Sequence, residues 1–92
     1  MFWKDNAGIH SDEGWTLRSL SLTKIKYVEG EREALLPFEF LGVVGEVYFA
    51  AEDVADWSQP AKRPMTPDER IIVAQRVISA LEWVGFKVRS QD

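Results

Sequence analysis

The residues Thr66-Pro67-Asp68-Glu69 open the stretch TPDERIIVAQRVISALEWVG (66–85), which predicts one long helix. Thr66 suits the N-cap, Pro67 suits the first turn because its missing N–H is not needed there, and Glu69 completes a capping box. Gly85 predicts the end of the helix, because glycine adopts the left-handed cap conformation without a steric penalty. At about 100° per residue, the apolar residues gather on one side that should pack against a sheet. These residues are Ile71, Val73, Ala74, Val77, Ile78, Ala80, Leu81 and Val84.

The chain before this helix contains short runs that alternate between apolar and polar residues and predict strands. The expected strands cover residues 15–20, 24–28, 32–40 (interrupted at Pro37) and 46–50, and a last edge strand covers 86–89 beside them. Residues 52–57 should form one short helical turn with Val54 and Trp57 packed inward, and residues 58–64 a loop. Residues 1–15 are rich in turn formers, so we expect a frayed or loosely docked start with room for a short strand.

These elements predict an α+β fold. We expect an antiparallel β-meander of about four to five strands, with one long C-terminal α-helix packed on one face. The length of 92 residues favours a single domain that spans residues 1–92.

The composition excludes several classes of protein. Hydrophobic residues make up 46% and charged residues 28%, which argues against an intrinsically disordered chain. There is no cysteine, so disulfides and thiolate chemistry are excluded, as suits a reducing cytosol. No apolar run approaches the roughly 20 residues of a membrane span, and the first residues lack the apolar core of a signal peptide. We therefore expect a cytoplasmic protein with no membrane partner.

The negative charge is concentrated in the middle third of the chain. The net charge is −4, which argues against nucleic acid as a partner. Residues 31–60 hold seven acidic residues and one arginine. Some of these carboxylates should pair with basic residues that follow position 61, and the others should form a partner-binding surface. The candidate residues are Glu39, Glu46, Glu52, Asp53 and Asp56, together with Trp57 as either a core residue or an anchor.

Two apolar residues of the predicted helix, Ile72 and Trp83, lie on its polar side. Exposed tryptophan is enriched at interfaces because it offers a large contact area with a polar handle. The helix therefore carries a secondary candidate surface at these two residues. The alternative is that residues 1–15 fold back and cover Trp83.

No pattern of residues predicts catalysis, a cofactor or a metal site. His10 is the only histidine and has no carboxylate or cysteine at ligand spacing, so we expect an ordinary surface residue. Gly42 and Gly45 are not followed by the lysine and hydroxyl residue of a phosphate loop. Asp68 and Glu69 are explained by the helix N-terminus, where negative charge is favourable. We expect a protein that is not an enzyme and needs no cofactor.

From Ile25 onward, the chain resembles a family of small bacterial immunity proteins from polymorphic-toxin and contact-dependent growth inhibition systems. The resemblance covers residues 24–88 and is a pattern of structural positions, so it carries over no binding residues. The matching segments, in chain order, are 25–32 (IKYVEGER), 39–42 (EFLG), 47–48 (VY), 57–60 (WSQP), 65–72 (MTPDERII) and 85–86 (GF). Such proteins are not enzymes, and they bind and block the toxic C-terminal domain of a partner, often a nuclease, in the cytoplasm.

The resemblance implies an immunity protein that binds a cognate toxin domain. An acidic surface would suit this role, because a nuclease holds nucleic acid in a basic cleft. One alternative is a small phage-derived or housekeeping structural module that self-associates through an edge strand. Another is a small-ligand-binding domain or enzyme with its pocket between helix and sheet, which would be marked by an apolar pocket with convergent polar groups.

Overall fold

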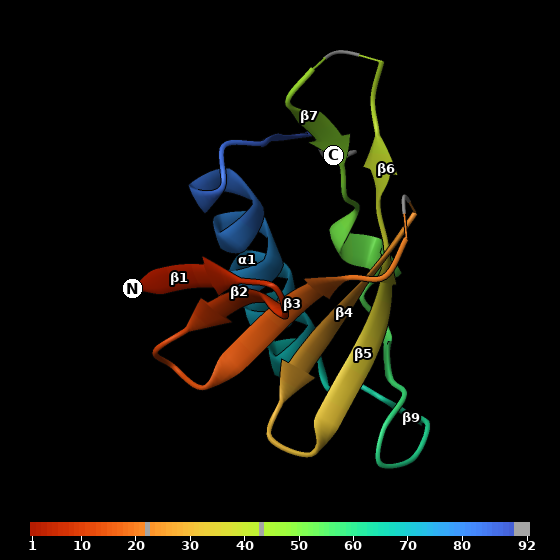
Figure 1. The fold of residues 1–92 in the computed structure, drawn as a ribbon. Helices are drawn as coiled ribbons and strands as arrows, with labels where there is room; N and C mark the ends of the chain where they lie inside the picture. The colour runs from red at the N-terminus through yellow and green to blue at the C-terminus, as the bar shows by residue number, and fades with distance from the viewer. Residues whose placement is uncertain (22, 43, 90–92) are drawn as a thin grey trace.

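The computed structural model describes residues 1–21, 23–42 and 44–89, and its largest unit is a five-stranded antiparallel sheet (Figure 1). Each strand pairs with the next in the order β1-β2-β3-β4-β5. Helix α1 (Pro67–Trp83) lies across one face of this sheet. The α+β architecture with a meander and a C-terminal helix is therefore confirmed. The bounds of the five strands are Phe2–Asp5, Gly8–Ser11, Trp15–Ser19, Lys24–Glu29 and Arg32–Pro37.

Two small sheets complete the fold. A three-stranded sheet has the order β10-β7-β6, and strands β8 and β9 form a separate pair. A short 3-10 helix, η1 (Ala51–Asp53), follows β7. In chain order, the remaining strands are β6 (Glu39–Phe40), β7 (Glu46–Tyr48), β8 (Asp56–Trp57), β9 (Arg63–Pro64) and β10 (Lys87–Arg89).

A row of buried side chains crosses the five-stranded sheet. Ile9, Leu17, Tyr27 and Ala34 are successive cross-strand partners on β2 to β5, and all four are buried. They belong to one hydrophobic cluster with helix residues such as Val77. Because side chains alternate between the two faces of a strand, a shift of one residue would turn such a row outward. The apolar face of α1 therefore fixes the register of the sheet.

Both ends of α1 follow the sequence prediction. The N–H of Glu69 donates to Thr66 Oγ1 at 3.1 Å, and the N–H of Thr66 donates to Glu69 Oε1 at 2.9 Å, which completes the capping box. At the other end Gly85 has a φ of 105°, and the N–H of Phe86 donates to the carbonyl of Leu81 at 3.0 Å. These contacts satisfy backbone groups that a helix leaves unpaired at its ends.

The predicted apolar stripe is too wide. Val73, Val77 and Leu81 are buried, but Ile78 is only partly buried and the side chain of Ile71 is 56% exposed. The reason is geometric, because Ile78 and Ile71 lie about 100° and 120° around the helix from Val77. The sheet covers only the residues closer to the centre of the stripe.

The first fifteen residues are not a loosely docked start. Residues 2–11 form the hairpin β1–β2, which extends the meander by two strands. The chain start is tied to the turn after β2, because the amino group of Met1 pairs with Asp12 at 3.0 Å and the N–H of Asp12 donates to Met1 O at 3.2 Å. The turn formers in this stretch lie in two connections: residues 6–7 join β1 to β2, and residues 12–14 join β2 to β3.

Several expected elements have different partners or bounds. The strand expected over 46–50 is the shorter β7, and it lies outside the meander because it pairs with β6 and β10. The stretch 58–64, expected as a loop, ends in strand β9, which pairs with β8. The strand at 86–89 does not lie beside the meander, since β10 pairs in parallel with β7. The expected strand 32–40 divides after Pro37 into β5 and β6, because proline has no N–H to continue the ladder. The helical turn expected over 52–57 covers only residues 51–53, and Trp57 lies on β8. Val54 and Trp57 are buried, as predicted.

Candidate protein-binding surface

Three of the five acidic candidates gather around Tyr48 on the three-stranded sheet. Glu39 on β6 is the direct antiparallel partner of Tyr48 on β7. Burial raises the pKa of the Tyr48 phenol, and the negative charges of Glu52, Asp53 and Glu39 raise it further. Repulsion of this kind requires the carboxylates to lie near the phenol. We call Glu39, Glu52 and Asp53 the acidic face.

The carboxylates of the acidic face are not neutralised by basic side chains. None of them forms an ion pair with another residue of the described segments 1–21, 23–42 and 44–89. All three residues are exposed. Their charge therefore acts on the solvent and on any approaching partner.

The other two acidic candidates are placed differently. Glu46 on β7 accepts a hydrogen bond from Arg89 Nε at 2.7 Å, so its charge is compensated within the three-stranded sheet. Asp56 lies on β8, where it lines a hollow of about 310 Å³ together with Lys62. The structure thus separates Glu46 and Asp56 from the acidic face.

An apolar hollow borders the acidic face. It encloses about 310 Å³ between η1 and the first turns of α1, and Glu52 and Ile71 both line it. Arg70 also lines this hollow and is held in place by a hydrogen bond from its Nε to the carbonyl of Val54 at 2.8 Å. Ile71 therefore presents an apolar side chain next to a carboxylate, a combination that the helical projection did not predict.

Trp57 is a core residue and does not serve as an anchor. Its side chain is 1% exposed, and its indole N–H donates to Glu69 Oε1 at 3.3 Å. The guanidinium of Arg32 stacks over the ring, with Cζ 4.4 Å from the ring centroid. A partner could reach Trp57 only by disrupting these contacts.

The secondary candidates on α1 are accessible. Ile72 is 46% exposed and Trp83 is 47% exposed. Phe2 of β1 packs against Trp83 with ring centroids 5.7 Å apart, so the N-terminal hairpin covers part of this side chain. Both interpretations of Trp83 therefore hold in part, because it is half covered by the hairpin and half open to a partner.

A polar network joins the β4–β5 hairpin to α1, and sequence reasoning did not find it. Arg32 pairs with Glu29 at 3.0 Å and with Glu69 at 2.6 Å, while Arg76 pairs with Glu29 at 3.3 Å. The phenol of Tyr27 donates to Glu29 at 3.0 Å and accepts from Arg76 at 2.7 Å. The only local sign of this network in the sequence is the pair Glu29 and Arg32, which lie three residues apart across a turn that contains glycine. The other partners are distant in the sequence.

Two members of the network, Tyr27 and Glu69, have strongly shifted pKa values. Burial raises the pKa of Tyr27 to about 12. The backbone N–H of Thr66 is the main cause that lowers the pKa of Glu69 to about 2, with further contributions from Trp57 and Arg63. Both groups therefore keep one protonation state across the neutral range. The network holds the β4–β5 hairpin against the helix.

His10 is more constrained than the expected surface residue. Its Nε2 lies 2.8 Å from Asp5 Oδ1, its Nδ1 lies 3.0 Å from Thr16 Oγ1, and its ring stacks on Trp3 at 5.4 Å. These contacts join β1, β2 and β3 on one face of the sheet. Across the described residues, no three His, Cys, Asp or Glu side chains come together as potential metal ligands.

Comparison of the chain with protein-family models, with curated proteins and with solved structures gives no match. The resemblance to immunity proteins therefore stays a prediction from the sequence. No helix in the described part of the chain is long and apolar enough to cross a membrane.

Proposed function

We propose that this protein is an immunity protein that binds and neutralises the cytotoxic C-terminal domain of a polymorphic or contact-dependent inhibition toxin. It acts in the cytoplasm by stoichiometric binding, without catalysis and without a cofactor. The observation that carries the proposal is the uncompensated charge of Glu39, Glu52 and Asp53, which adds to the resemblance described above.

The acidic face suits a partner with a basic surface. Opposite charges on two proteins accelerate their encounter, and the effect weakens as salt screens the charges. A nuclease toxin is such a partner, because it needs a basic cleft to hold nucleic acid. Ile71 and the adjoining hollow supply apolar contact area beside the carboxylates. An interface of this kind combines electrostatic steering with an apolar centre.

A growth assay tests the proposed activity directly. The C-terminal domain of a large secreted protein encoded immediately upstream would be expressed with and without this protein. We expect the domain alone to stop growth, and co-expression to restore growth together with recovery of a one-to-one complex. A toxic domain that is neither bound nor neutralised by this protein would refute the proposal.

Association kinetics test the position of the interface. Glu52→Lys and Asp53→Lys should each slow association with the toxin domain by about threefold at low ionic strength, and the difference should shrink in high salt. Glu31→Lys is the matched control, because it makes the same charge change on the β4–β5 turn, at the other end of the molecule from β7 (Figure 1). Charge reversal at Glu52 and Asp53 that leaves the association rate unchanged at low salt would move the interface to the other candidate surface, the helix flank with Ile72 and Trp83. Equal slowing by all three substitutions would show an effect of net charge alone and would contradict the placement on the acidic face.

A further inference from the structure

A second, mostly apolar pocket opens between the five-stranded sheet and the last turn of α1. It encloses about 220 Å³. Strands β2, β3 and β4 contribute the side chains of Ile9, Leu17 and Ile25, and the other sides include Leu81 of α1 and Phe38 after β5. All five of these residues belong to the hydrophobic core. The pocket is thus an opening in the core and is distinct from the acidic face.

The topology explains why this opening persists. Helix α1 ends at Trp83, and the chain turns at Gly85 into β10. Strand β10 pairs with β7 of the three-stranded sheet and not with the five-stranded sheet (Figure 1). The chain after α1 therefore leaves the five-stranded sheet, and the pocket lies between the last helical turn and the inner faces of β2 to β4.

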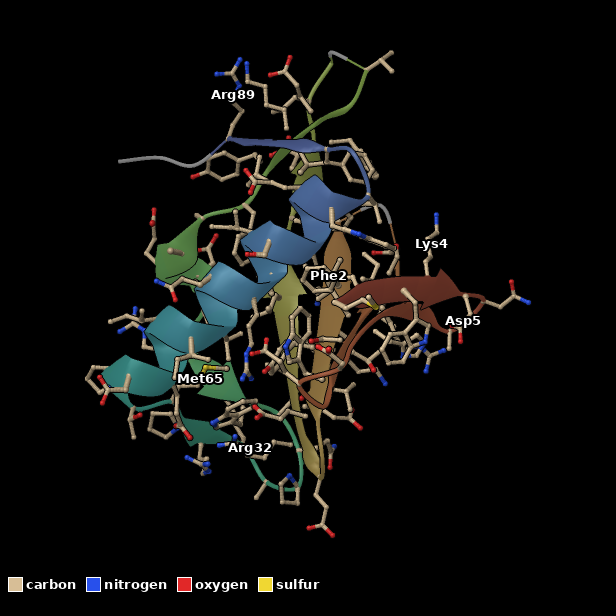
Figure 2. The ribbon with its side chains drawn as sticks, turned by 90° about the vertical axis from the view of Figure 1, so that its left-hand side faces the viewer. Phe2, Lys4, Asp5, Arg32, Met65 and Arg89 are labelled. Carbon is tan, nitrogen blue, oxygen red and sulfur yellow. The ribbon has the colours of Figure 1, made fainter. Side chains whose placement is uncertain are left out.

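Lys4 supplies the charge at the pocket. It is the only charged residue among those that line this pocket in the described part of the chain. Its ammonium group has no ion-pair partner within the described segments. Figure 2 shows Lys4 extending from β1 on the side of the last turn of α1, in agreement with its place beside Val84 and Phe86 in the pocket lining. An unpaired cation beside an apolar pocket is complementary to an amphiphile with an anionic head group.

We propose that this pocket binds a small aliphatic amphiphile with a single anionic head group, held by Lys4. A dry apolar cavity of about 150 Å³ holds benzene, so 220 Å³ accommodates a chain of roughly eight carbon atoms. The chain lies against Leu81 and the inner face of the sheet, while the head group lies at Lys4.

Titration with octanoate tests the proposal without any protein partner, so its outcome is independent of toxin binding. We expect saturable NMR shifts of the methyl groups of Ile9, Leu17 and Leu81 at millimolar octanoate, with smaller changes elsewhere. Octylamine, with the same chain and the opposite charge, should bind more weakly. No saturable binding of octanoate, or equal affinity for the amine, would overturn the proposal.

Substitutions separate the role of the charge from that of the apolar surface. Lys4→Met should weaken octanoate binding about three- to fivefold while leaving the affinity for 1-octanol unchanged. Lys62→Met is the matched control on an exposed loop and should change neither affinity. Ser19→Phe, at an exposed position in the pocket lining, should reduce binding of both compounds. The same octanoate affinity in the Lys4 and Lys62 variants would refute the assignment of Lys4.

Discussion

Replacement of Gly8 by alanine should destabilise the protein by far more than an ordinary surface substitution. Gly8 begins β2 with a φ of +133°, in a region that residues with a side chain rarely adopt. A Cβ added to Gly8 would lie 2.3 Å from the carbonyl oxygen of Leu17 and 3.2 Å from Cα of Arg18. Both neighbours are backbone atoms of β3, so relief of the contact requires β2 and β3 to move apart.

The expected loss has two parts. Backbone strain at a positive φ costs of order 1–3 kcal/mol. Overpacking against a structure that must shift costs a further 1–3 kcal/mol or so. Gly8→Ala should therefore reduce the free energy of unfolding by about 2–6 kcal/mol, a large share of the roughly 5–15 kcal/mol of a small domain.

Gly14→Ala is the matched control for the contact. Gly14 also has a positive φ, +95°, but a Cβ there would meet nothing within 4 Å. This variant should lose only the strain contribution. Urea denaturation followed by tryptophan fluorescence measures both losses, because Trp15 and Trp57 are buried. The argument from close approach fails if the two alanine variants lose the same free energy of unfolding.

Amide hydrogen exchange would show which part of the sheet opens first in the Gly8→Ala variant. The strained contact lies between β2 and β3, and β1 is an edge strand whose strand partner is β2. The amides of the β1–β2 hairpin should therefore lose protection first, while those of β4 and β5 keep theirs. Uniform loss of protection over the whole sheet would show that the hairpin and the rest of the sheet unfold as one unit.

Two further predictions concern α1. Leu81→Ala removes a buried side chain at the contact between helix and sheet and should lower the free energy of unfolding by about 2–5 kcal/mol in chemical denaturation. Ser79→Ala, on the exposed side of the helix, should change the free energy of unfolding by less than about 0.5 kcal/mol. Losses of similar size at both positions would show that the faces of the helix are assigned wrongly. The second prediction concerns pH. The pKa of Glu69 is about 2 in the folded protein, below the ordinary value of 4.5 expected in the unfolded chain. The ionised carboxylate therefore stabilises the fold, and this contribution is fully present above about pH 4.5. This contribution should disappear as the pH falls from 4.5 to 2. The variant Glu69→Gln keeps an oxygen that can accept the N–H of Thr66 but has no charge. The difference in denaturation midpoint between this variant and the natural protein should therefore narrow as the pH falls from 4.5 to 2. A difference that stays constant over this range would contradict the assigned pKa.

The two candidate surfaces differ in how accessible they are to a partner. The acidic face and Ile71 lie around η1 and the first turns of α1, and none of the three carboxylates forms an ion pair within the described part of the chain, although Arg70 lines the same hollow as Glu52. The flank with Ile72 and Trp83 is partly occupied by Phe2 and lies beside a hollow of about 470 Å³ that Arg76 also lines. A partner on this flank would contact the N-terminal hairpin as well as α1.

Elements whose causes are local could be predicted from the sequence. Thr66, Glu69 and Gly85 define the ends of α1 through contacts within a few residues, and the structure has the helix at these bounds. The alternation of residues over 15–20 and 24–28 likewise predicts β3 and β4 to within one residue, since period-two alternation is a local property of a strand. Gly30, in the turn between β4 and β5, has a φ of +61°, which glycine adopts without a steric penalty.

Which surfaces meet and which stay open depends on contacts between elements that are distant in the sequence. The parallel pairing of β10 with β7 depends on where α1 ends relative to the three-stranded sheet, and no local pattern encodes that position. The compensation of Glu46 by Arg89 and the burial of Trp57 depend on partners that lie far away in the sequence or on other elements. The exposed Ile71 shows the same limit. Helical periodicity predicts which side of a helix is apolar, but the width of the covered strip is set by the elements packed against it, and these come together only when the chain folds.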